Sequence, residues 1–239
     1  MREIQIIILA AGLGTRLGLP LPKPLTPLAD GRSILRHQLD NLRQTFADAA
    51  RIAVVVGFRY DLIMGAAPEV RFVYNERYDE TNTARSLLKA LRTSHSGGVL
   101  WLNGDVVFDP GLLERAQALI ESDRTFACVN TAAVGEEEVK YRTDADGYLT
   151  ELSKSVIDGR GEAVGINYVA SADKAALIEH LERCTDQDFF ERGMESAIKE
   201  GRLRVKALDI SDCFVVEVDF ADDLERANTE VNRTVTPAA

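Results

Sequence analysis

Hydrophobic and polar positions in the first half of the chain switch repeatedly between two periods. Continuous apolar runs rich in β-branched residues predict buried strands, and apolar residues three or four positions apart predict amphipathic helices. The expected strands are 3–10, 51–58, 69–75 and 97–105, and the expected helices are 33–46, about 60–64, 83–93 and 109–122. Ser33 and Asp109 stand where helix N-caps are expected, with Pro110 in the first turn of its helix. This alternation predicts a parallel sheet with helices on both faces and right-handed crossovers.

The second half of the chain has a different pattern, in which several strands follow one another before helices return. Strands are expected within 126–134, 139–155, 161–170, 203–210 and 214–219, and helices within 171–184, 187–201 and 221–233. The segment Ala145-Asp146-Gly147 predicts a hairpin turn. The sequence has no internal repeat and no linker rich in Pro, Gly or Ser. We therefore expect a single α/β domain over 1–239, with mixed strands added at one edge of a mostly parallel sheet and a frayed tail at 233–239.

Acidic residues outnumber basic ones. The chain has 239 residues, and 28 Lys and Arg against 38 Asp and Glu give a formal net charge of −10. Nucleic acids and anionic membranes bind basic surfaces, so this balance argues against both as partners. It allows a small anionic ligand that a few local cations hold.

The cysteines and the N-terminus indicate a cellular compartment. Cys128, Cys184 and Cys213 are far apart, odd in number and without metal-ligand spacing, which is typical of reduced, packed thiols in an intracellular protein. The N-terminal apolar run is too short to span a bilayer and has no cleavage pattern after it. These features predict a cytoplasmic protein.

A loop lean in side chains, "LAAGLGTRLGLPLPKPLT" (9–26), follows the first expected strand. It does not fit the dinucleotide fingerprint G-x-G-x-x-G, because Leu17 stands where the third glycine belongs, and it is not a Walker A loop. Its small residues, from Ala10 to Gly14, allow backbone N–H groups to approach phosphate oxygens. The alternative is that the glycines only make a tight turn.

Two cations in this loop suit a polyphosphate. The Arg16 guanidinium can fork two phosphate oxygens, and Lys23 lies between Pro22 and Pro24, whose φ angles are restricted. An ammonium placed in advance suits negative charge that builds up during phosphoryl transfer. A merely solvated Lys23 is the structural alternative.

The string "IILAAGLGTRL…PKPL" resembles the N-terminal signature of nucleotidyltransferases of the sugar-nucleotide pyrophosphorylase superfamily. The resemblance implies a glycosyltransferase-A-like, Rossmann-like fold that binds a nucleoside triphosphate in 1–110 and a phosphorylated acceptor in 111–232. It implies that the nucleotide is bound by loop residues, namely Leu9, Ala10, Ala11, Gly12, Gly14, Thr15, Arg16 and Lys23. It also implies catalytic roles for Arg16, Lys23 and Asp105.

Three acidic residues follow apolar strands. Asp105 is the last residue of the expected strand 97–105. Glu217 and Asp219 end another expected strand, and their spacing of two residues places their side chains on the same side of it. A few carboxylates with phosphates at the remaining positions suit Mg²⁺. The resemblance agrees, since Asp105 and Asp219 match the metal-binding aspartates of the superfamily and Glu217 lies beside them. Capping of a turn and of the last helix is the alternative for these aspartates.

The segment "NERYDETNTARSLLKAL" (75–91) opens a helix with short polar residues. It resembles the N-x-x-Y-x-x-x-N-x-x-x-S segment of phosphocholine cytidylyltransferases, and "GINYV" (165–169) and "VEVD" (216–219) resemble other segments of the same enzymes. The resemblance implies CTP as the nucleotide, with Asn82 and Thr83 near it. On physical grounds alone, Asn82 can equally be a helix cap.

The acceptor is less constrained. Lys140 and Lys154 can hold its phosphate or phosphonate, and Tyr168 and Glu191 can take part in a headgroup site, although a surface strand and a helix core explain such residues as well. We expect Mg²⁺-dependent transfer of a cytidylyl group from CTP to a small phosphorylated alcohol or phosphonate. Uridylyl, thymidylyl or guanylyl transfer to a sugar 1-phosphate, and a non-catalytic nucleotide-binding domain, are the alternatives. A homodimer is compatible with the sequence.

Overall fold

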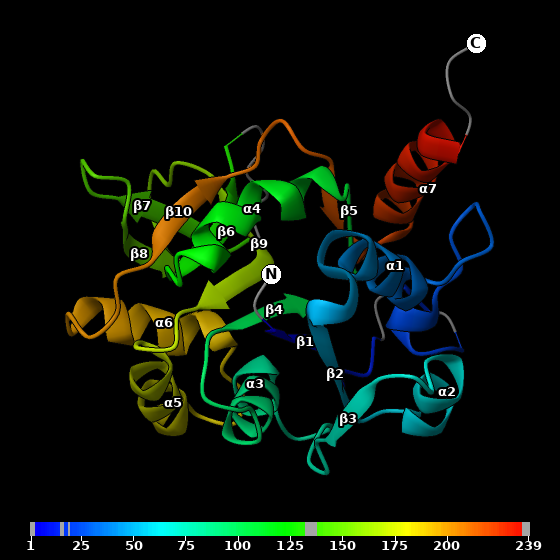
Figure 1. Cartoon of the computed structure of the whole chain (residues 1–239), viewed down its shortest axis with the longest axis horizontal. Coiled ribbons are helices and arrows are strands. Elements are labelled where there is room, and N and C mark those ends of the chain that lie inside the picture. The colour runs from blue at the N-terminus through cyan, green and yellow to red at the C-terminus, as the bar shows by residue number, and fades with distance from the viewer. Residues whose placement is uncertain (1–2, 15–16, 19, 132–137, 236–239) are drawn as a thin grey trace.

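A long sheet with the strand order β10-β6-β9-β4-β1-β2-β3 forms the centre of the protein (Figure 1). The computed structural model describes residues 3–14, 17–18, 20–131 and 138–235. The strands of this sheet and of its branch are β1 (Ile4–Ala10), β2 (Ala50–Val56), β3 (Arg71–Tyr74), β4 (Val99–Asn103), β6 (Phe126–Asn130), β7 (Lys140–Thr143), β8 (Leu149–Ser153), β9 (Glu162–Val169) and β10 (Lys206–Asp209). The helices are α1 (Ile34–Phe46), α2 (Tyr60–Ala66), α3 (Thr83–Arg92), α4 (Gly111–Glu121), α5 (Lys174–Arg183), α6 (Phe190–Lys199) and α7 (Ala221–Val235).

The four strands that the first half of the chain gives to this sheet are parallel, as the sequence predicts. β1 pairs in parallel with β2 and β4, and β2 pairs in parallel with β3. The carboxyl ends of β1 and β4 therefore lie at the same edge of the sheet, with Leu9 opposite Asn103. This edge is where open α/β sheets bind ligands.

The later strands extend the sheet on the β4 side, which confirms the expected mixed additions. β9 is antiparallel to both β4 and β6, and β10 is parallel to β6. β7 and β8 form the expected hairpin, and β7 joins the start of β9 where Lys140 lies opposite Glu162. β9 thus runs opposite to its neighbours and brings its first residues to the carboxyl end of β4.

Helices cover both faces of the sheet because successive strand residues point to opposite sides. In β1, Ile6 and Ile8 pack in a core with α1, α2 and α4, whereas Ile7 and Leu9 pack in a second core with α3, α5 and α6. Ser33 caps α1 as expected, since its hydroxyl accepts a hydrogen bond from the backbone N–H of Arg36 at 3.2 Å. Within the described ranges, no helix combines the length and the apolar character needed to cross a bilayer.

The structure also contains a small second sheet that the sequence pattern does not separate from its surroundings. β5 (Val106–Phe108) pairs in antiparallel fashion with β11 (Val215–Glu217), and α7 packs on this pair. The expected strand 97–105 ends at Asn103 and continues as β5 after a turn. The following helix begins at Gly111, so Pro110 is its N-cap and the Asp109 carboxylate accepts a hydrogen bond from the Gly111 N–H.

Candidate active site

A cleft of about 880 Å³ opens at the carboxyl ends of β1 and β4. Its walls come from the loop after β1, the start of α3, the turn after β4, the first half of β9, the start of α6 and the end of β11. Among the residues singled out from the sequence, those that line it are Leu9, Ala10, Gly12, Gly14, Lys23, Asn82, Thr83, Asp105, Lys154, Glu191, Glu217 and Asp219. Thr15 and Arg16 lie outside the described residues. Ala11 is buried behind the cleft, where its carbonyl accepts a hydrogen bond from Phe58.

The loop after β1 is packed against the segment that carries Lys23. Gly14 has a φ of +61°, and a Cβ at this position would lie 2.8 Å from the Lys23 Cβ. Lys23 begins the short 3-10 helix η2 (Lys23–Leu25), in which the Thr26 N–H donates to the Lys23 carbonyl at 3.0 Å. The two flanking prolines restrict the same segment. The backbone of Lys23 is therefore fixed before any ligand arrives.

The turn between β4 and β5 presents Asp105 to the cleft. Gly104 donates to the Leu9 carbonyl at 2.8 Å, and a Cβ on this glycine would lie 2.7 Å from that oxygen, so only glycine allows such a close approach. From α1, the buried side chain of Gln38 donates to the carbonyls of Asn103 and Val106, both at 2.8 Å. The turn is thus held on two sides.

Asp219 reaches the same point through the small second sheet. The β5–β11 pairing places Glu217 opposite Val106, and the Val218 N–H donates to the Asp105 carbonyl at 3.0 Å. Residues more than a hundred positions apart in the sequence therefore meet at one end of the cleft.

One ammonium joins the two aspartates. Lys23 Nζ donates to Asp105 Oδ2 at 2.7 Å and also to Asp219 Oδ1. Burial alone lowers the pKa of Lys23, but the two carboxylates raise it above its ordinary value, so the side chain stays protonated. The other carboxylate oxygen of Asp105 is buried and has no hydrogen-bond partner in the described part of the chain.

This arrangement fits a divalent cation with few protein ligands. Asp105 and Asp219 carry the hard oxygen donors that such an ion prefers, and one of them, Asp105 Oδ1, has no hydrogen-bond partner among the described residues. Across residues 3–14, 17–18, 20–131 and 138–235, no group of three or more His, Cys, Asp or Glu side chains is placed to hold a metal. A site with two carboxylates, completed by water and phosphate oxygens, suits Mg²⁺ better than Zn²⁺.

Glu217 lies beside the aspartates and contacts a different partner. Its Oε1 accepts a hydrogen bond from Asn103 Nδ2 at 2.9 Å. Burial, together with the nearby Asp105 charge, raises the pKa of Glu217 well above its usual range. Gly165 leaves room for this pair, because its φ is +68° and a Cβ there would lie 2.4 Å from Glu217 Oε1.

Asn82 is the N-cap of α3, Thr83 is its first residue, and both line the cleft. The Asn82 side chain accepts a hydrogen bond from the Thr83 N–H at 2.8 Å, so Asn82 is the helix cap that the sequence analysis gave as one of its two possible roles. The Thr83 hydroxyl accepts one from the Phe190 N–H at 3.0 Å and so ties α3 to the start of α6. Both polar groups remain at the wall of the cleft.

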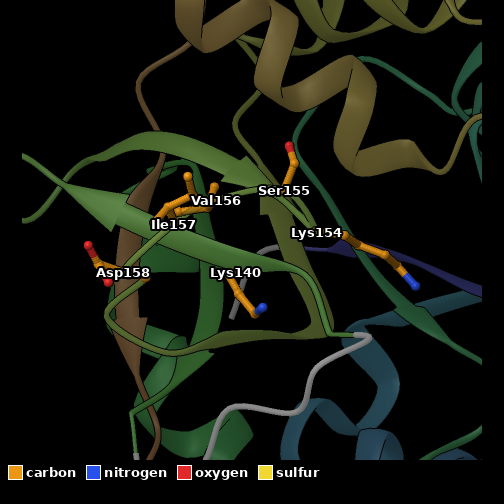
Figure 2. A pocket seen from close by; sticks show the side chains of 7 residues that line it. Lys140, Lys154, Ser155, Val156, Ile157 and Asp158 are labelled. Carbon is orange, nitrogen blue, oxygen red and sulfur yellow. The ribbon is translucent and has the colours of Figure 1, made fainter.

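The four expected acceptor residues do not all line the cleft. Lys154 and Glu191 line it, and Lys154 also lines a second pocket of about 540 Å³ beside the β7–β8 hairpin, which it shares with Lys140. In Figure 2, Lys154 extends away from the side chains of Val156, Ile157 and Asp158 that share this second pocket with Lys140.

Tyr168 is placed wrongly by the sequence analysis. Because β9 is antiparallel to β4, Tyr168 lies opposite Leu100, near the amino end of β4 and away from the cleft. Its hydroxyl donates to Asp123 at 2.8 Å, and its ring stacks on Phe126. It is a buried core residue.

Several residues that line the cleft are not expected from the sequence, namely Asn103, Glu138, Glu162 and Arg226. Asn103 could have been found, since it is the last residue of a strand that ends beside the glycine loop. Glu138 and Arg226 come from an irregular segment and from the last helix, where no period indicates which side chains face a cleft.

Known proteins resemble most of this chain. The MobA-like NTP transferase domain family matches residues 6–205. The CMP-5'-(3-aminopropyl)phosphonate synthase of Streptomyces rubellomurinus is 31% identical over 94% of this chain, and the match covers 38% of that relative, so this chain spans well under half of its length.

Two solved structures have the same fold. The inositol-1-phosphate CTP transferase from T. maritima superposes with a TM-score of 0.77 at 17% identity, over 98% of this chain and 99% of its own. The CTP:phosphocholine cytidylyltransferase from Streptococcus pneumoniae superposes with a TM-score of 0.75 at 17% identity, over 96% and 99% of the two chains. These likenesses confirm the Rossmann-like fold expected from the sequence.

Proposed function

Because this chain belongs to the MobA-like NTP transferase family, we propose that it transfers a cytidylyl group from CTP to a small acceptor that carries a phosphonate or phosphate. The family match and the 31% identical relative confirm the prediction that this chain is a nucleotidyltransferase. The choice of CTP is supported by the name of that relative, which describes a CMP-linked phosphonate. The observation that carries the proposal is the meeting of the Lys23 ammonium with Asp105 and Asp219 beside the glycine loop.

The nucleotide belongs in the half of the cleft built from 1–110. Backbone N–H groups of the loop from Leu9 to Gly14, with Thr15 and Arg16 after them, would receive the triphosphate. Asn82 and Thr83 stand at the same wall and would face the ribose or base. Mg²⁺ held by Asp105 and Asp219, with Glu217 next to them, would neutralise charge on the triphosphate.

The transfer needs positioning more than it needs proton chemistry. An anionic oxygen of the acceptor attacks the α-phosphorus, the new P–O–P bond forms, and the bond from the α-phosphorus to the β-phosphate oxygen breaks, so that pyrophosphate leaves with the electron pair. No general base is required because the attacking oxygen already carries the charge. Lys23 is placed to hold negative charge in the transition state, and orientation of the two anions can lower the barrier by about 7–11 kcal/mol.

The acceptor belongs in the half of the cleft built from 111–232. Lys154 and Arg226 are the described cations that line this side, and Glu191 lines the same space. Lys140 and Tyr168 lie elsewhere and take no part in the proposal.

The test is a matrix of CTP, UTP, dTTP, GTP and ATP against small phosphonates, phosphorylated alcohols and sugar 1-phosphates. Pyrophosphate release measures turnover, and the mass of the product identifies the bond made. We expect product with CTP and a small phosphonate or phosphate, and only with a divalent cation present. Preference for UTP, dTTP or GTP with a sugar 1-phosphate would contradict the proposal.

A further inference from the structure

The acceptor side of the cleft holds more carboxylates than an anionic acceptor alone would favour. Glu138, Glu162 and Glu191 line it together with Lys154. Burial raises the pKa of both Glu138 and Glu191. The Glu162 charge raises the pKa of Glu138 further, and the Glu138 charge raises that of Glu191. The Lys154 charge lowers both pKa values. Lys154 can hold a phosphonate here, but the surplus of negative charge favours a cationic group in the same ligand.

Glu191 differs from Glu138 and Glu162 because it is a buried side chain with an unpartnered oxygen in the described part of the chain. It lies in the first turn of α6 and is only 9% exposed, yet its Oε2 is buried without a hydrogen-bond partner in the described part of the chain. Burial raises the pKa of Glu191 to about 7. A buried carboxylate oxygen without a donor is costly, so this oxygen, in a residue that lines the cleft, points to a donor that arrives with a ligand.

A second buried glutamate on the same helix shows what a carboxylate with a purely structural role looks like. Glu195, one turn further along α6, is more deeply buried and does not line the cleft. Its two oxygens accept from Arg192 at 2.9 Å and from Lys199 at 2.7 Å. The chain therefore supplies partners for one buried glutamate and leaves the other facing the cleft.

We propose that Glu191 accepts hydrogen bonds from a protonated amine at the end of the acceptor opposite its phosphonate or phosphate. This inference rests on the proposed function and names the acceptor class, an ω-amino alkyl phosphonate or phosphate ester. Phe189, at the rim of the cleft beside Lys154, offers an apolar wall for the alkyl chain.

The same geometry selects against a quaternary ammonium. A trimethylammonium group has no N–H donor and cannot satisfy the Glu191 oxygen. It is usually held by several aromatic faces. Among the described aromatic rings that line the cleft, Phe189 and Phe220 are exposed, with Phe220 next to Asp219, but Phe190 is buried edge-on against Trp101. The acceptor side is thus built for an amine with hydrogens.

The experiment measures kcat/KM with CTP and Mg²⁺ for matched acceptors. 2-Aminoethylphosphonate is compared with propylphosphonate, which lacks the charge, and phosphoethanolamine is compared with phosphocholine, which lacks the N–H donors. We expect the amine to be favoured in each pair on the order of 100-fold, because the partner compound leaves the buried carboxylate unpaired. The comparison of the phosphonate with the phosphate ester identifies which of these sources of the anionic group is used.

Two variants assign the preference to one side chain. We expect Glu191→Gln to reduce the preference for the amine to within about threefold, and Glu195→Gln, on the same helix, to leave the preference unchanged. Transfer without preference for the amine, or an undiminished preference in Glu191→Gln, would overturn the inference and leave cytidylyl transfer standing.

Binding measured by calorimetry separates the two proposals. Binding of 2-aminoethylphosphonate that Glu191→Gln weakens, without transfer from any nucleotide, would overturn the proposed function and support the inference. Absence of both binding and transfer would overturn both.

Discussion

Replacing Lys23 by methionine removes the ammonium between Asp105 and Asp219 and keeps an aliphatic stem of similar length. The lysine side chain is 10% exposed, and the two carboxylates are 24% and 26% exposed. Removing one partner of a fully buried ion pair costs about 3–5 kcal/mol, whereas an exposed pair contributes about 0–1 kcal/mol. For carboxylates with about a quarter of their surface in water, we expect a loss of about 2 kcal/mol.

Thermal unfolding without nucleotide or divalent cation measures this loss. In a protein of this size, 1 kcal/mol shifts Tm by about 2–4 °C, so Lys23→Met should lower Tm by about 4–8 °C. Mg²⁺ should then raise the Tm of the variant more than that of the wild type, because in the wild type the ammonium competes for the same oxygens.

Lys89→Met is the matched control. Its ammonium also pairs with a carboxylate at 2.7 Å, that of Glu76, but the two side chains are 31% and 57% exposed. We expect this variant to lose less than about 1 kcal/mol. Equal losses in the two variants, or a Lys23→Met protein that Mg²⁺ does not stabilise beyond the wild type, would refute the view that one buried ammonium holds the two aspartates together.

Further variants test other parts of the structure. Lys23→Ala should lower kcat by about 10²–10³-fold in steady-state assays with little change in the KM for CTP, because its charge acts mainly in the transition state. Gly165→Ala should cost about 2–3 kcal/mol in urea unfolding, since it adds a clash with Glu217 to an unfavourable φ, whereas Gly201→Ala, with a φ of +67° and open space, should cost only about 1 kcal/mol. Burial raises the pKa of Glu69, but hydrogen bonds from two arginine side chains lower it to about 2. Because the pKa of Glu69 is lower in the folded than in the unfolded state, the carboxylate stabilises the fold above about pH 4.5, and this contribution is lost as pH falls toward 2. After allowance for solvent screening, Glu69→Gln should lower the free energy of unfolding by about 1 kcal/mol at pH 7 and reduce its fall with decreasing pH in acid denaturation.

The first half of the site could be predicted because its elements follow from local patterns. Strands buried on both faces appear in the sequence as continuous apolar runs, and parallel strands end at a common edge. The end of β1 at Ala10 and the end of β4 at Asn103 therefore place the glycine loop next to Asp105 without knowledge of other contacts.

The second half of the site depends on pairings that leave little trace in the sequence. Asp219 reaches Asp105 through β5 and β11, each of which has three residues, too few to establish a period. The direction of a strand within the sheet also cannot be predicted from its own residues. The run "GEAVGINYVA" predicts a strand correctly, but only the fold shows that β9 is antiparallel to β4, so that Glu162 instead of Tyr168 comes to the cleft.

Charge in the cleft constrains the chemistry in a way that the whole-chain charge does not. The described residues that line it include three cationic side chains, Lys23, Lys154 and Arg226, against seven carboxylates. Such a surface would repel a triphosphate and an anionic acceptor together if both approached as bare anions. Two additions remove the conflict: a divalent cation that arrives with the nucleotide, and a positive group on the acceptor itself. Because each addition acts at a different end of the cleft, Asp105→Asn should raise the Mg²⁺ concentration needed for half-maximal turnover without altering the choice between amine and neutral acceptors. Glu191→Gln should alter that choice without changing the Mg²⁺ requirement.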